Sequence, residues 1–101
     1  MTDEMKTQVA EWKKEHGHVY LSSIGDVDYI YRTLTREDYQ NLMIKQVSAP
    51  TTFDHDMEVF VTCVLSEYND SDLSSKGGVV TVISEKIMLR SGFEQVESEE
   101  L

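Results

Sequence analysis

The sequence predicts an α+β domain in which an N-terminal helix and a β-hairpin precede three helices that pack on the hairpin. Two observations predict this class. Runs of β-branched and aromatic residues flank a Gly-Asp pair, and three later segments repeat apolar residues at helical spacing. A chain of 101 residues fits one domain. We expect that domain to span residues 1–93, and residues 94–101 to form an acidic tail.

The first predicted helix covers residues 3–15, within an N-terminal segment of residues 1–16. Met5, Val9 and Trp12 follow one another at i, i+4 and i+7, which places them on one narrow stripe of a helix. Three apolar anchors are few for a helix of this length, so we expect packing or a partner to order it. Trp12 is therefore either a core residue or an anchor at an interface.

The predicted hairpin joins residues 19–24 to residues 27–31 through Gly25 and Asp26. Gly at the first central position of a two-residue loop favours a type II′ turn, whose twist matches the strands it joins. Apolar residues occur on both faces of the hairpin, which indicates that helices or a partner cover part of each face. An isolated two-stranded hairpin is only marginally stable in water, so other elements must pack against it.

The second and third helices are predicted from capping residues and apolar spacing. Thr35 is a suitable N-cap for the second helix, and Pro50 requires that helix to end before it. Thr52 or Asp54 can cap the third helix. Its wide apolar stripe predicts a helix that continues to Tyr68. The β-branched residues in this segment also permit a strand, but the helical spacing favours the helix. The stripes comprise Tyr39, Leu42, Met43 and Val47 in the second helix, and Phe53, Met57, Phe60, Val61, Val64, Leu65 and Tyr68 in the third.

Residues 69–78 are polar and contain paired glycines, so we expect a flexible linker there. Residues 79–91 then form the last predicted helix. Gly92 is placed to adopt a left-handed conformation after it, with Phe93 folding back on the last turn as in a Schellman motif. Gly17 is expected to end the first helix in a similar position.

The chain carries 19 acidic and 9 basic residues, for a formal net charge of −10. This excess argues against a nucleic-acid backbone or an anionic membrane surface as partner, because both attract cations. It is compatible with simple solubility, with a basic protein partner or with mimicry of nucleic acid. The charged N-terminal segment is no signal peptide, and no apolar run is long enough to span a membrane.

No pattern in the sequence predicts an enzyme, a metal site or a cofactor site. His16, His18 and His55 match no zinc-binding spacing, and we expect them to be solvated. Cys63 is the only cysteine, and its apolar surroundings predict a buried, unreactive thiol. Nucleophile elbows, phosphate-binding glycine loops and zinc-protease motifs are missing from the sequence.

The order of these elements resembles the small tail-assembly chaperones and related tail or baseplate assembly proteins of tailed bacteriophages. The resemblance covers residues 17–93. It rests on three sequence motifs. The first is an aromatic residue followed by R-x-L-[ST]-R-x-[DE]-[FY] at the exit of the hairpin. The second is CVL within a helix, and the third is SGF at the end of the final helix. The matching residues are Tyr31, Arg32, Leu34, Thr35, Arg36, Asp38 and Tyr39, then Cys63, Val64 and Leu65, then Ile87, Ser91, Gly92 and Phe93.

The resemblance implies a non-enzymatic role in assembly through protein–protein contacts. The implied partners are other phage tail proteins, either the tape-measure protein or baseplate components, and further copies of the chain. The implied location is the host cytoplasm or the virion. The alternative function is that of an acidic phage-encoded inhibitor or adaptor, which mimics nucleic acid to bind a host protein. Trp12, Tyr20, Tyr29, Tyr31 and Phe93 are the candidate protein-binding residues, as apolar contacts in the core or at an interface.

Overall fold

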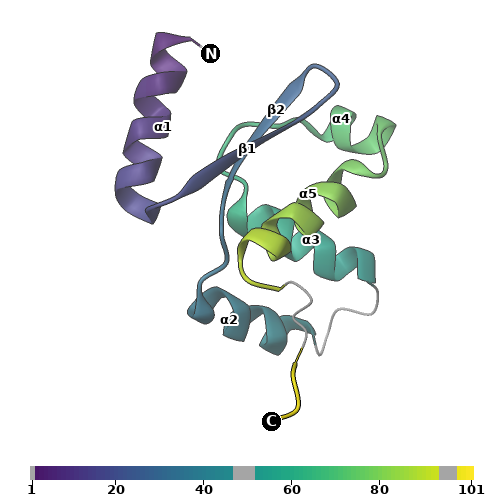
Figure 1. Cartoon of the computed structure of the whole chain (residues 1–101). Helices are drawn as coiled ribbons and strands as arrows, with labels where there is room; N and C mark the ends of the chain where they lie inside the picture. The colour runs from purple at the N-terminus through teal and green to yellow at the C-terminus, as the bar shows by residue number, and fades with distance from the viewer. Residues whose placement is uncertain (1, 47–51, 94–97) are drawn as a thin grey trace.

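A computed structural model describes residues 2–46, 52–93 and 98–101 of the chain (Figure 1). It confirms the α+β class. The elements in chain order are α1 (Asp3–His16), β1 (Val19–Ile24), β2 (Val27–Arg32), α2 (Arg36–Gln46), α3 (Thr52–Cys63), α4 (Asp70–Ser75) and α5 (Val79–Arg90). Four sequence predictions lie outside the described residues: the stripe position Val47, the break at Pro50, the side chain of Thr52 as a cap, and residues 94–97 of the tail.

The hairpin forms as the sequence predicts. Its strands pair antiparallel, with Ile24 opposite Val27 and Tyr20 opposite Tyr31. Gly25 has a φ of 60°, and among the described residues only glycines have a positive φ. A positive φ at the first loop residue but not at the second is the pattern of a type II′ turn.

The hairpin runs between α1 on one side and the packed pair α3 and α5 on the other (Figure 1). Successive side chains of a strand point to opposite faces. Tyr29 and Tyr31 therefore share the face that packs into the core with α3 and α5, while Asp28 and Ile30 belong to the face turned toward α1. The core consists of Tyr29, Tyr31, Leu34, Leu42, Val59, Phe60, Cys63, Val79, Val80, Ile83 and Ile87.

The third helix ends earlier than the sequence predicts, at Cys63 rather than at Tyr68. Its last predicted turn is instead an extended segment on the outer edge of β2. Val64 forms a β-bridge with Tyr31, and the Leu65 N–H donates to the Ile30 carbonyl at 2.8 Å. A strand edge presents unpaired backbone groups that need partners when buried. The extended conformation, in which this segment pairs with the edge of β2, is therefore more stable here than one further turn of α3.

The predicted linker contains a short helix, α4, where the sequence predicts only a flexible segment. Asn69 caps it, because its side-chain oxygen accepts from the Asp72 N–H at 2.8 Å. Leu73 on this helix packs against the core. Such a short helix has too few residues to show helical periodicity, so only its cap could have indicated it.

Three helix termini agree with their predicted caps. Thr35 caps α2, since its hydroxyl accepts from the Asp38 N–H at 3.1 Å. Gly17, with a φ of 84°, follows the end of α1. After α5, Gly92 has a φ of 96° and the Phe93 N–H donates to the Met88 carbonyl at 3.0 Å. This last bond belongs to the predicted Schellman motif.

An ion pair fixes the start of α2 to the end of β2. Arg32 donates to the Asp38 carboxylate, and it also donates to the Thr62 carbonyl of α3 at 3.1 Å. The Thr35 N–H donates to the same carboxylate at 2.9 Å, which completes a reciprocal cap. Burial raises the pKa of Asp38, but the hydrogen bonds from Arg32 and Thr35 outweigh it and hold that pKa below its usual value.

Candidate protein-binding groove

Helix α1 is well formed locally but weakly packed. The Thr2 hydroxyl accepts from the Met5 N–H at 3.2 Å, which satisfies an amide at the N-terminus of the helix. Acidic residues occupy its first turn and basic residues its last, as the helix dipole favours. Yet none of the residues of α1 is buried. Capping and dipole effects are small, so they cannot replace the packing that stabilises most helices in proteins.

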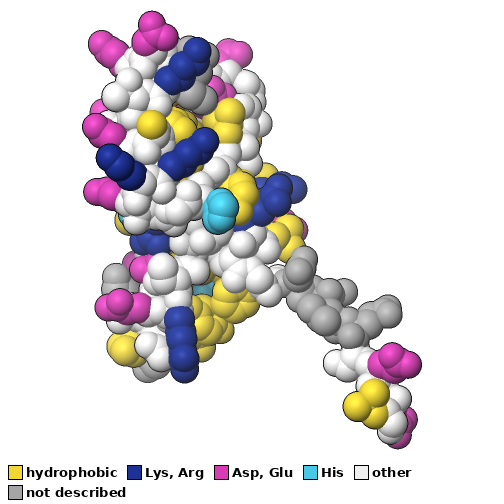
Figure 2. Space-filling view, turned by 60° about the vertical axis from the view of Figure 1, so that its left-hand side comes forward, with side chains coloured by type: hydrophobic (Ala, Val, Ile, Leu, Met, Phe, Trp, Pro, Cys, Tyr) yellow, Lys and Arg dark blue, Asp and Glu magenta, His cyan; other side chains and the backbone are white. Residues whose placement is uncertain are grey.

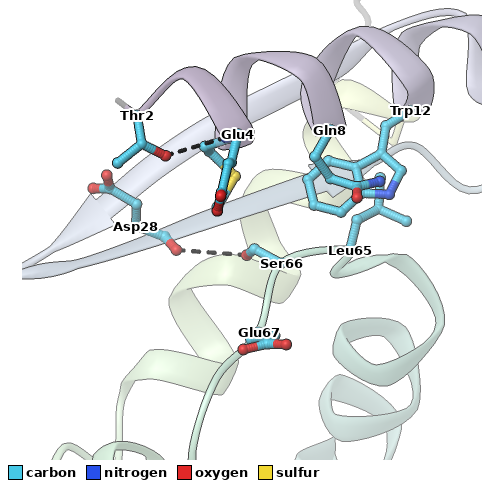
Figure 3. Close-up of a pocket in the computed structure, with 9 residues that line it drawn as sticks. Thr2, Glu4, Gln8, Trp12, Asp28, Leu65, Ser66 and Glu67 are labelled. Carbon is cyan, nitrogen blue, oxygen red and sulfur yellow. Dashed lines mark hydrogen bonds between the residues drawn. The ribbon is translucent and has the colours of Figure 1, made fainter.

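A groove separates α1 from the extended segment that follows α3 (Figure 3). Its volume is about 520 Å³. Side chains from α1 form one wall, and the edge of the hairpin with the extended segment forms the other. The lining residues are Thr2, Glu4, Met5, Gln8, Trp12, Asp28, Leu65, Ser66 and Glu67.

The apolar part of the groove comes from Met5, Trp12 and Leu65. All three side chains are half-buried, so each keeps apolar surface exposed to solvent. Figure 3 shows Trp12 and Gln8 extending from α1 toward the extended segment. A half-buried Trp beside other apolar side chains is the kind of residue that anchors protein interfaces.

The polar part of the groove is acidic. Glu4, Asp28 and Glu67 line it, and no Lys or Arg is among the lining residues. The ion pair of Arg32 with Asp38 lies outside the groove lining, as does the contact of His16 Nε2 with Glu15 Oε2 at 3.4 Å. Glu4 and Glu67 therefore line the groove without an ion-pair partner from the described part of the chain.

Ser66 holds the extended segment in place. The Ile30 N–H donates to the Ser66 hydroxyl oxygen at 2.9 Å, and the Ser66 N–H donates to the Ile30 carbonyl at 3.3 Å. Ser66 is buried, so these bonds are shielded from water. They fix Leu65 and Glu67, the neighbours of Ser66 in the chain, along one wall of the groove.

The structure separates the five candidate binding residues. Only Trp12 lines the groove. Tyr29 and Tyr31 are 1% and 2% exposed, so they belong to the core and cannot contact a partner directly. The strand places both on the face that packs against α3 and α5. For these two residues the core alternative holds, and their assignment to an interface is corrected.

Tyr20 and Phe93 lie at the surface but away from the groove. Tyr20 is half-buried, stacks on Tyr31 with ring centroids 6.1 Å apart, and has the Arg90 guanidinium 4.9 Å above its ring. Phe93 is 42% exposed and contacts Tyr39 at a centroid distance of 4.8 Å. Neither residue is among the lining residues of the groove that contains Trp12.

The sequence does not indicate that the other lining residues meet at one groove. The sequence predicts that Leu65 lies on the apolar stripe of a helix, whereas the structure places it in the extended segment. Ser66 and Glu67 carried no signal in the sequence. The wall they form depends on hydrogen bonds with Ile30, which is far away in the chain. The β-branched residues near the end of α3 were the one local indication of extended structure.

The remaining reactive groups are few in the described part of the chain. Cys63 is fully buried in the core, as predicted, and burial raises the pKa of its thiol to about 11. Among residues 2–46, 52–93 and 98–101, no group of three or more His, Cys, Asp and Glu side chains is placed to hold a metal ion. Within the same ranges, no helix combines the length and the apolar character needed to span a membrane.

Comparisons of the chain with protein-family models, with curated proteins and with solved structures found no match.

Proposed function

We propose that this chain is a non-enzymatic binding protein that acts in phage tail assembly through protein–protein contacts made at the groove beside α1. The observation that carries the proposal is that α1 has no buried residue although it borders a groove with a half-buried Trp. A helix with so little packing of its own gains stability when a partner covers its apolar stripe. The assignment to tail assembly comes from the resemblance of residues 17–93.

The resemblance names the partner class, and the groove supports the mode of action. Tail-assembly chaperones work by holding other tail proteins, which requires an exposed apolar surface rather than a catalytic pocket. Met5, Trp12 and Leu65 supply such a surface. The acidic excess of the chain helps to keep unassembled copies apart, since like charges repel.

The alternative of an acidic decoy has less support. A mimic of nucleic acid needs carboxylates arrayed over one continuous face. On the face that carries α1, Asp and Glu side chains are interspersed with Lys and Arg (Figure 2). Mixed charge of this kind is typical of an ordinary soluble surface.

Affinity capture tests the proposal. The full chain, tagged and expressed during phage infection, is used as wild type and as Trp12→Ala. We expect the wild type to capture tape-measure or baseplate protein, and we expect Trp12→Ala to lower the yield by about tenfold or more, because loss of an interface anchor costs about 2 kcal/mol.

The matched control is Phe53→Ala. Phe53 is 53% exposed and lies outside the groove, so its removal leaves capture unchanged. Capture of a host nucleic-acid enzyme instead of tail proteins would establish the decoy function. Capture of tail proteins by Trp12→Ala at the wild-type level would remove the groove from the mechanism.

A further inference from the structure

We propose that the occupant of the groove is a basic segment of the partner, in which apolar anchor residues are flanked by Lys or Arg. This inference rests on the proposed function, because it names the chemistry of the partner at the same groove. It follows from the charge of the lining, from the apolar surface between the charges, and from the charge of the competing occupants.

The charged residues of the lining are all acidic. Glu4 on α1, Asp28 on β2 and Glu67 after α3 line the groove (Figure 3). The Asp28 carboxylate also accepts a hydrogen bond from the Ser23 hydroxyl at 2.5 Å. Glu4 and Glu67 are both exposed and form no ion pair with the described part of the chain. Clustered like charges raise the local potential and attract a segment of the opposite sign. A cationic occupant pairs with these carboxylates, whereas a neutral one leaves them unpaired.

The apolar part of the groove requires an occupant that carries apolar anchor residues in addition to positive charge. The groove has a volume of about 520 Å³. Met5, Trp12 and Leu65 offer apolar side chains within it. A purely cationic segment would leave these side chains in contact with water. A segment with apolar residues between its basic residues matches both parts of the lining.

Two other occupants fit the charge poorly. The C-terminal residues 98–101 read Ser-Glu-Glu-Leu, so they bring further negative charge toward an acidic groove. A second copy of the chain brings a formal net charge of −10. Both are disfavoured by repulsion at low salt. A basic partner segment is the occupant with a complementary charge.

The test uses two synthetic peptides titrated into the full chain and followed by NMR. The first peptide contains paired leucines flanked by lysines, and in the second every lysine is replaced by glutamate. We expect only the basic peptide to shift the signals of Trp12 and Leu65. We also expect its affinity to fall as salt rises, because screening weakens exposed charge pairs.

Charge variants assign the effect to the groove. In Glu4→Gln/Glu67→Gln, we expect the basic peptide to bind about three- to tenfold more weakly, as expected for two exposed ion pairs. The matched control is Glu37→Gln/Glu85→Gln, which removes the same charge from exposed positions outside the groove. This control leaves the affinity at the wild-type value once the small change in net charge is screened by salt.

Three results would overturn the inference. The first is equal binding of the acidic and basic peptides, and the second is equal affinity for both double variants. The third is a concentration-dependent shift of the Trp12 signal without peptide, which would identify a second copy as the occupant. If capture of tail proteins still depended on Trp12 in these cases, the proposed function would stand and only the basic occupant would fail.

Discussion

On one face of the β-hairpin, α3 and α5 pack into a core, while on the other face α1 lies without burying a single one of its residues. Both sides use the same strands, and β2 contributes side chains to each in alternation. Secondary structure alone therefore does not distinguish the stable parts of this molecule from the adaptable ones, because what differs between these helices is how many of their residues are buried.

The core side is organised around Phe60. Its ring lies 5.9 Å from that of Tyr29 and 4.9 Å from that of Tyr68, both in edge-on arrangements. Such contacts add to the burial of apolar surface. The α1 side has Trp12 in a comparable position on its helix, but this residue borders a groove instead of a packed interior. An aromatic side chain therefore stabilises the fold on one side and remains available for binding on the other.

The largest expected contrast is between alanine substitutions of these two aromatic residues. Phe60→Ala leaves a cavity in the core and should lower the free energy of unfolding by about 3–5 kcal/mol. Trp12→Ala should lower it by about 1 kcal/mol or less, because the indole is only half-buried. Urea unfolding followed by far-ultraviolet circular dichroism measures both values. Equal losses for the two variants would contradict the comparison, since Trp12 would then be a core residue.

The next largest loss of stability is expected when the ion pair between Arg32 and Asp38, which joins α2 to β2, is removed. Asp38→Asn removes the partner of Arg32 and part of the cap, so we expect a loss of about 1.5–3 kcal/mol at neutral pH. The folded pKa of Asp38 is lowered. Its contribution is therefore fully present above the unfolded pKa, about 3.9, and is lost as pH falls through the folded pKa.

Unfolding of wild type and Asp38→Asn at a series of pH values checks this sign. The two stability curves should be separated at neutral pH and should converge in acid. Curves that stay parallel down to the acid limit would show that the carboxylate charge contributes nothing to the fold.

A smaller loss in the free energy of unfolding is expected for a substitution of Ser66, which lies between the core and the groove. Ser66→Ala leaves the Ile30 N–H without its acceptor and should cost about 1–2 kcal/mol. The substitution also loosens the segment that carries Leu65 and Glu67. We therefore expect weaker partner binding in addition to lower stability. The free energy of unfolding and the affinity for the partner are both measured, to show whether Ser66 supports the groove wall as well as the fold. Unchanged partner binding would show that the groove wall does not depend on Ser66.

Predictions from sequence succeeded where the cause is local. Gly25 with Asp26, Thr35 as a cap, and Gly92 with Phe93 each set the chain direction through neighbouring residues, and all three agree with the structure. Turn and cap preferences act within a few residues, so one sequence is enough to recognise them.

Predictions failed where the cause is distant. The extended course of residues 64–66 depends on the unpaired edge of β2, and α3 ends early for that reason. The groove in turn requires Leu65 to face Trp12 from another part of the chain. Met5, Trp12 and Leu65 of its lining are recognisable in the sequence as apolar positions, but Leu65 is predicted on a helix. Tyr29 and Tyr31 were recognised as apolar, but their burial depends on which hairpin face meets α3 and α5.

Hydrogen exchange of the full chain, alone and with its captured partner, tests most directly whether α1 is a weakly held element that a partner completes. In the free chain, we expect the amides of α1 to exchange at least about tenfold faster than those of α5, because local opening needs little free energy where few residues are buried. On binding, protection should rise in α1 and stay unchanged in α5. Free α1 amides as protected as those of α5, or no gain of protection in α1 with the partner bound, would contradict the account.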